Sequence, residues 1–121
     1  MRKILIIEDD IFLRDLEANK LKKSNYDIVT VSTGDEALEK INEPNIDLIL
    51  LDLIIPGIDG FDVLKKIKEL EHTKSIPVIV FSNLSEEKDV EKAKELGALD
   101  FMVKSNFSLN ELAEHINKIL S

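Results

Sequence analysis

Three carboxylates of this sequence occupy positions that suit chemistry, because each follows an apolar run at the point where a strand would end. Glu8 and Asp9 follow the run 4–7, and Asp52 follows the run 46–51. Carboxylates ~4 Å apart repel one another by roughly 4 kcal/mol at a moderate effective dielectric, so a cation must offset them. Oxygen ligands without histidine or cysteine suit Mg²⁺ or Mn²⁺. These residue types therefore indicate a divalent metal site.

A hydroxyl and an ammonium group end two further apolar runs. Ser82 ends the run that begins at Val78, and Lys104 follows the run 99–103. In an open parallel sheet the carboxyl ends of the strands converge on one crevice, where ligands bind. We therefore expect these two residues to join the carboxylates in one site. Lys104 can pair with Asp52 or with a phosphate group, and Ser82 can donate a hydrogen bond.

The elements that must position these side chains alternate regularly along the chain. Short apolar or β-branched runs predict strands, and longer amphipathic segments predict helices. The predicted strands are 3–8, 26–31, 46–51, 78–81 and 99–103, and the predicted helices are 11–24, 34–42, 60–70, 85–96 and 109–120. The predicted helix boundaries rest on Asp10, Thr33 with Glu36, Asp59, Gly97 and Ser108 with Glu111. This alternation predicts an α/β fold with helices on both faces of a parallel sheet.

Length and composition limit the possible classes of protein. A chain of 121 residues suits a single domain that spans 1–121, and the absence of cysteine excludes disulfides and thiolate metal sites. With 24 acidic residues against 16 basic ones, the net charge is −8, so we expect no direct binding of nucleic acid. No secretion signal or membrane-length apolar run is visible, which predicts a cytoplasmic protein without a membrane partner.

These residues carry a resemblance to a known family. Through Glu8, Asp9, Asp52, Ser82 and Lys104 the chain resembles the response-regulator receiver domains, the CheY-like phosphoacceptor domains of two-component systems. The resemblance covers the whole length. It implies a flavodoxin-like, doubly wound (βα)5 fold with strand order 2-1-3-4-5. It also implies phosphorylation of an aspartate by a sensor histidine kinase or a histidine phosphotransfer protein, with Mg²⁺, or alternatively Mn²⁺, bound beside it.

The family's roles transfer position by position. Asp52 is then the phosphoacceptor and a metal ligand, and Asp9 is a direct metal ligand. Glu8 would act mainly through metal-bound water, and the backbone carbonyl of Ile54 would complete the metal site. Ser82 and Lys104 would bind the phosphoryl oxygens.

The resemblance also implies a switch. Ser82 would close on the phosphoryl group, and Phe101 would occupy the position of the switch aromatic. The helix 85–96 has only Val90, Ala93 and Leu96 to bury, so we expect it to be loosely docked. An unknown downstream protein would bind the face formed by this helix, the fifth strand and the fifth helix. We expect a monomer or a weak phosphorylation-dependent dimer.

Several positions depart from the family pattern. Asn83 stands where alanine or glycine is usual and would crowd the phosphoryl site. Ser105 replaces the usual proline and changes how the loop holds Lys104. Ile54 and Leu84 are apolar and cannot orient an attacking water, so we expect slow autodephosphorylation.

Two other functional classes remain open. The chain could be a small Mg²⁺-dependent phosphohydrolase, although Ile54 stands where a second acid is needed, and we expect no turnover of an external substrate. It could instead be a phosphorylation-independent, receiver-like interaction module. Taken singly, each of these polar residues can also be interpreted as a turn-forming residue or as a charge exposed to solvent. His72 and His115 are interpreted as surface residues on helices.

Overall fold

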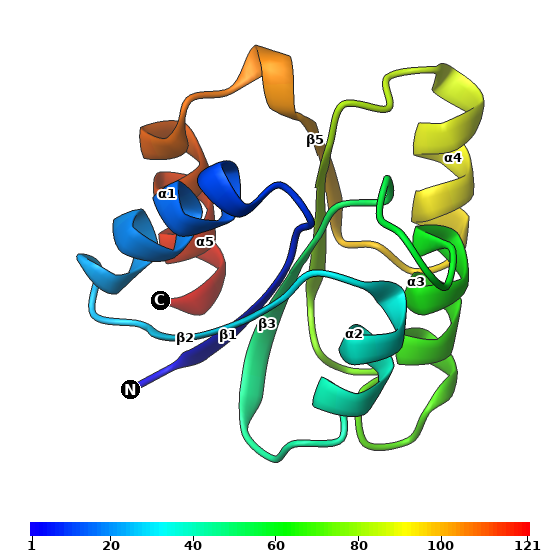
Figure 1. Cartoon of the computed structure of the whole chain (residues 1–121), viewed down its shortest axis with the longest axis horizontal. Coiled ribbons are helices and arrows are strands. Elements are labelled where there is room, and N and C mark those ends of the chain that lie inside the picture. The colour runs from blue at the N-terminus through cyan, green and yellow to red at the C-terminus, as the bar shows by residue number, and fades with distance from the viewer.

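The computed structural model describes residues 1–121 as one five-stranded parallel sheet between two layers of helices (Figure 1). The strand order is β2-β1-β3-β4-β5, which confirms the order that the family resemblance implied. All neighbouring strands pair in parallel. The strands are β1 (Lys3–Ile7), β2 (Asp27–Val31), β3 (Ile46–Leu51), β4 (Val78–Ser82) and β5 (Asp100–Val103).

Five α-helices cover the two faces of this sheet. In Figure 1, α1 and α5 lie on one face, and α2, α3 and α4 lie on the other. A short 3-10 turn, η1 (Lys104–Asn106), connects β5 to the last helix. The helices are α1 (Ile11–Lys22), α2 (Gly34–Lys40), α3 (Gly60–Glu69), α4 (Glu87–Glu95) and α5 (Leu109–Leu120).

The sheet separates two apolar cores because successive side chains of a buried strand point to opposite faces. Leu5 and Ile49 belong to the core under α2, α3 and α4, whereas Ile4 and Leu48 belong to the core under α1 and α5. β3 is buried on both faces apart from Asp47, as its continuous apolar run predicted. This rigid centre holds the strand ends at fixed positions.

Local capping explains most of the helix boundaries. Asp10, Asp59 and Ser108 accept hydrogen bonds from backbone N–H groups in the first turns of α1, α3 and α5, as predicted. Glu111 completes the capping box of α5. Gly97 follows α4 with a φ of 109°, which confirms its position after the C-cap.

Some details of the helices differ from the prediction. Thr33 caps α2, but the side chain of Glu36 returns to the backbone N–H of Ser32 and to the Thr33 hydroxyl, so the predicted capping box is incomplete. α4 begins at Glu87 instead of residue 85, without a side-chain cap. His72 lies in the turn after α3, not on a helix. The remaining boundaries differ by one or two residues, because helix and strand ends fray.

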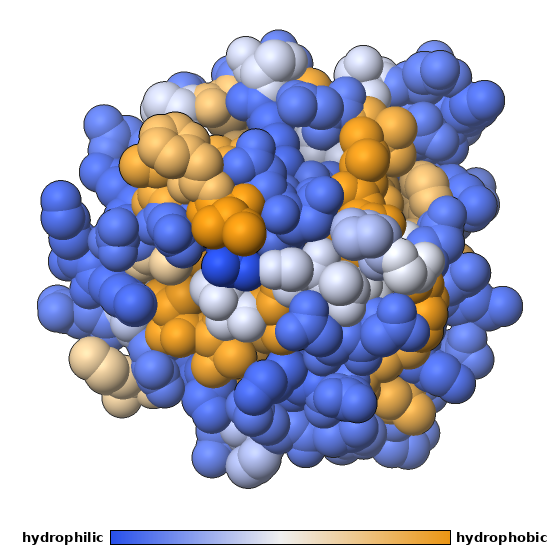
Figure 2. All heavy atoms as spheres, viewed as in Figure 1, coloured by the Kyte–Doolittle hydropathy of each residue, from blue (hydrophilic) through white to orange (hydrophobic).

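α1 exposes two large apolar side chains and buries an acidic one. Phe12 is 76% exposed and Ile11 is also exposed, whereas Glu17 is buried. In Figure 2, apolar atoms lie over the region of α1 on a face that is otherwise mostly hydrophilic. Ala93 is the only buried residue of α4, in agreement with the few apolar residues of this helix; its loose docking stays a prediction. No helix in the structure combines the length and hydropathy that a membrane span needs.

Candidate functional site

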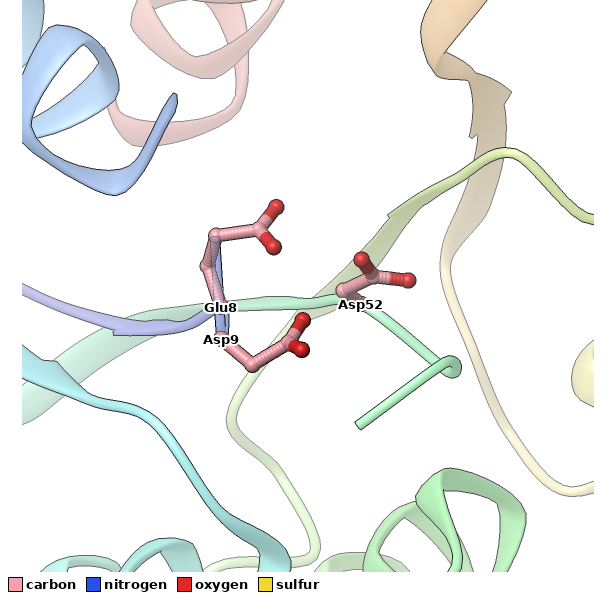
Figure 3. Close-up of side chains that lie close together, drawn as sticks. All are labelled: Glu8, Asp9 and Asp52. Atoms are coloured by element: carbon pink, nitrogen blue, oxygen red, sulfur yellow. The ribbon is translucent and has the colours of Figure 1, made fainter. Parts of the chain in front are cut away.

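The three carboxylates found in the sequence meet at the carboxyl ends of β1 and β3 (Figure 3). One carboxylate oxygen from each of Glu8, Asp9 and Asp52 lies within 4.8 Å of those of the other two. Glu8 and Asp52 are only 2% and 5% exposed, whereas Asp9 is exposed. The group therefore forms a buried floor with one carboxylate open to solvent.

Strand pairing fixes the positions of these side chains. The N–H of Asp52 donates to the carbonyl of Ile7, and the N–H of Glu8 donates to the carbonyl of Val31, both at 3.0 Å. These bonds continue the β1–β3 and β1–β2 ladders by one residue beyond the strands. Glu8 and Asp52 are consequently held by the rigid sheet and not by a free loop.

Lys104 places an ammonium group between two of the carboxylates. Its Nζ donates to Glu8 Oε1 and, at 2.6 Å, to Asp52 Oδ2. The lysine side chain is 11% exposed, so this ion pair is largely removed from water. Removing the lysine would leave two buried carboxylates without their cation, and this is costly in a low-dielectric interior.

The other oxygen of Asp52 is held by two further donors. The Ser82 hydroxyl donates to Asp52 Oδ1 at 2.7 Å, and the Ile54 N–H donates to the same oxygen at 3.0 Å. Ser82 is fully buried at the end of β4. Each carboxylate oxygen of Asp52 thus has a defined partner, which fixes its orientation.

Burial and neighbouring charges shift the pKa values of Glu8 and Lys104. Burial raises the pKa of Glu8, and the charge of Asp52 adds to this, while the hydrogen bond from Lys104 acts in the opposite direction. Burial opposes the charge of Lys104, but its hydrogen bonds to Asp52 and Glu8 outweigh that effect, so the pKa of Lys104 is raised. The ammonium is therefore firmly charged, and the carboxylates have more negative charge than it can cancel.

The donor set fits a divalent cation. All three carboxylates offer oxygen, the ligand atom that Mg²⁺ and Mn²⁺ prefer, and no histidine or cysteine belongs to the cluster. Lys104 offsets one negative charge of the three. The excess charge and the open side at Asp9 are the features that such an ion needs.

Other residues predicted for the site or its switch have no demonstrated role in it. Ile54 contributes its N–H to Asp52, and its side chain is 52% exposed; the metal-binding role of its carbonyl stays a prediction. Phe101 is half-buried on the edge strand β5, in register with Val80. Asn83 is exposed beside Ser82. Ser105 lies in η1, and Lys104 reaches Asp52 from the start of this turn.

Glu17 is a residue of the site region that sequence reasoning missed. Its side chain is buried on α1, at 1% exposure, and its Oε1 has no hydrogen-bond partner. Burial raises its pKa to about 8, and repulsion by Glu8 is the second cause. Leu13, Glu17 and Leu21 follow at four-residue intervals and so share one helix face. Phe12 and Leu16 offer a second apolar face, so the sequence alone does not decide which face is buried.

Comparison with known proteins places this geometry in a family context. The family model of the response regulator receiver domain matches residues 4–117. The phosphate regulon transcriptional regulatory protein PhoB of Escherichia coli is 34% identical over 119 residues, which cover 98% of this chain and 52% of PhoB. The chain therefore spans about half the length of this relative.

Solved structures of two response regulators are similar along nearly the whole chain. The phosphorylated cyanobacterial phytochrome response regulator RcpA has a TM-score of 0.85 at 33% identity, with 98% of this chain and 90% of RcpA covered. The Mn²⁺-bound form of response regulator Rcp1 has a TM-score of 0.83 at 32% identity, with 98% and 91% covered. One neighbour thus holds a phosphoryl group and another a divalent metal.

Proposed function

The chain belongs to the response regulator receiver domain family, and on this basis we propose that Asp52 accepts a phosphoryl group in a two-component phosphorelay. The donor is a phosphohistidine of a sensor histidine kinase or of a histidine phosphotransfer protein. The observation that carries the proposal is the arrangement around Asp52: its carboxylate is held by Lys104 and Ser82 and lies beside Glu8 and Asp9.

The reaction needs a positioned nucleophile. An oxygen of Asp52 attacks phosphorus, a new P–O bond forms, and the P–N bond to the donor imidazole breaks with its electron pair on nitrogen. The hydrogen bonds from Ser82 and Ile54 orient the carboxylate before attack, so little reorganisation remains for the reaction itself. Lys104 supplies a fixed positive charge beside Asp52 Oδ2, where the phosphoryl oxygens would lie.

A metal ion would add to this charge. Mg²⁺, or Mn²⁺ in its place, would be held by Glu8, Asp9, Asp52 and the Ile54 carbonyl, and would offset the negative charge of the phosphoryl oxygens. Glu8 and Asp52 would contribute ligands from the buried floor of the site, and Asp9 would contribute one from its exposed side.

Phosphorylation of Asp52 adds negative charge there, and this change alters the surface that a downstream protein binds. A phosphoryl group there competes for the Ser82 hydroxyl, which now donates to Asp52, and movement of Ser82 makes room for Phe101. The lightly packed α4 allows the face formed by α4, β5 and α5 to change with it. A downstream protein reads this face, and the receiver stays a monomer or forms a weak phosphorylation-dependent dimer.

Intact mass after incubation with acetyl phosphate and Mg²⁺ tests the proposal. We expect one added phosphoryl group on the wild type and on Asp62→Ala, an exposed control on α3, and none on Asp52→Ala. Circular dichroism checks that each variant is folded. Absence of the group from folded wild type would refute the proposal and favour a phosphorylation-independent interaction module.

A further inference from the structure

A cavity of about 260 Å³ opens between β5 and α5, away from the carboxylate site. β5 is the edge strand of the sheet, so no further strand closes this side. Phe101, Met102 and Phe107 supply its apolar lining. The volume is below the roughly 300 to 1,000 Å³ of sites that hold whole small-molecule ligands, so it suits a single side chain.

The polar rim of the cavity comes mainly from one face of α5. Glu111, Glu114 and Lys118 line it, and their spacing of three and four residues places them in one row on the helix. The remaining polar pair, Asp100 and His115, is engaged internally, with Asp100 Oδ2 lying 2.8 Å from His115 Nε2.

The rim leaves acidic charge available to a partner. The Glu111 side chain belongs to the capping box of α5, where its Oε1 accepts a hydrogen bond from the N–H of the N-cap residue Ser108 at 2.9 Å. Glu114 has no ion pair or hydrogen bond. Lys118 also has no ion pair, but the two carboxylates outnumber its single ammonium. An incoming cation therefore meets a net negative rim above an aromatic surface.

Arginine matches both parts of this surface. Phe107 is 38% exposed, and a guanidinium group can stack on an accessible aromatic ring while its N–H groups bind a carboxylate. Lysine offers a point charge without the flat surface. Arginine is also among the residues that most often anchor protein interfaces in pockets.

We propose that the β5–α5 cavity is an anchor site for an arginine side chain of a protein partner, with Phe107 and Glu114 as its main contacts. The proposal deepens the proposed function, because the cavity belongs to the face assigned there to the downstream protein. Phe101 also contributes to the lining of this cavity, and it packs against the core under α2, α3 and α4.

Backbone amide NMR of the full, unphosphorylated chain tests the proposal with N-acetyl-arginine amide as the probe. We expect saturable shifts at β5, at Phe107 and along α5. N-acetyl-citrulline amide, which is flat but neutral, should bind about threefold more weakly, an effect of the size expected for an exposed ion pair. Because phosphorylation is not involved, failure here is separate from failure of the acetyl phosphate experiment.

Two variants and a control make the test specific. Glu114→Gln should weaken arginine binding about threefold, and Phe107→Leu should weaken it while keeping an apolar wall. Glu95→Gln, an exposed acid on α4, should leave it unchanged. Equal binding of citrulline, shifts spread over the acidic surface, or equal effects of Glu114→Gln and Glu95→Gln would overturn the proposal. The same amides could instead shift when only the protein concentration is raised, without any probe. If those shifts disappear in Glu114→Gln, the cavity binds a second copy of the chain, and the arginine proposal is overturned.

Discussion

Replacing Glu17 with glutamine should remove a pH-dependent loss of stability from the protein. The Glu17 carboxyl is buried, and its pKa is raised from 4.5 to about 8, mainly by burial and then by repulsion from Glu8. Asp52 and Asp10 repel it further, and Lys104 is the one nearby charge that favours its ionisation. The folded protein therefore keeps this proton at pH values where the unfolded chain has released it.

The pH dependence of the free energy of unfolding, in sign and in size, follows from the different pKa of Glu17 in the folded and unfolded states. Below pH 4.5 both states are protonated and Glu17 causes no pH dependence. As the pH rises from 4.5 to about 8, the unfolded chain ionises first, so the free energy of unfolding falls by about 1.4 kcal/mol per pH unit. Above about pH 8 both states are ionised, and the total loss reaches on the order of 4 to 5 kcal/mol.

Urea denaturation of wild type and Glu17→Gln between about pH 5 and about pH 9 measures this effect. The glutamine amide is also buried, so it shifts stability by an amount that does not change with pH. We expect the variant to gain stability relative to wild type as the pH rises, by about 4 kcal/mol across this range. Glu39→Gln, an exposed acid on α2, is the control and should show no such gain.

The reasoning is refuted if the difference between wild type and Glu17→Gln is the same at both ends of the range. Glu8 is present in both proteins, and its own raised pKa lowers stability in the same direction as the pH rises. Comparing the two proteins therefore cancels most of its contribution.

Two further predictions concern the metal site and the phosphorylated state. Without metal, Asp9→Asn should be more stable than wild type by about 1 kcal/mol, because Asp9 is exposed and its repulsion is weakened by water. Mg²⁺ should raise the melting temperature of wild type by mass action but not that of Asp9→Asn, and equal shifts in scanning fluorimetry would contradict the assigned ligand. The phosphoryl group on Asp52 should persist for minutes to hours with Mg²⁺, because Ile54 and Leu84 offer no polar group to an attacking water. Loss of the added mass within seconds would contradict this.

The strand ends were predictable because they depend on local pattern and on one rule of topology. Apolar runs that end on Glu8, Asp52 and Ser82 identify strands, and parallel pairing brings their carboxyl ends to one edge. Capping residues set most helix starts for the same local reason. The order of the strands depended on the family resemblance, since the alternation of elements allows several orders.

The features that escaped prediction depend on how elements pack. α1 buries Ala18, Leu21 and Glu17 but exposes Phe12 and Ile11, because its rotation is set by its contacts with the sheet and α5. Hydropathy along the helix cannot give that rotation when apolar residues lie on more than one face. The β5–α5 cavity likewise results from the distance between an edge strand and a helix, which no local pattern encodes.

The position of Glu17 affects the charge balance of the site beside it. Glu8, Asp9, Asp52 and Glu17 carry four negative charges when all are ionised, and Lys104 carries one positive charge, so a net charge of −3 remains. With a pKa of about 8, Glu17 keeps its proton at neutral pH, and the sum becomes −2. A divalent cation cancels that charge completely. Retention of this proton therefore lowers the negative charge around the carboxylates, and stronger repulsion among them is expected as Glu17 ionises.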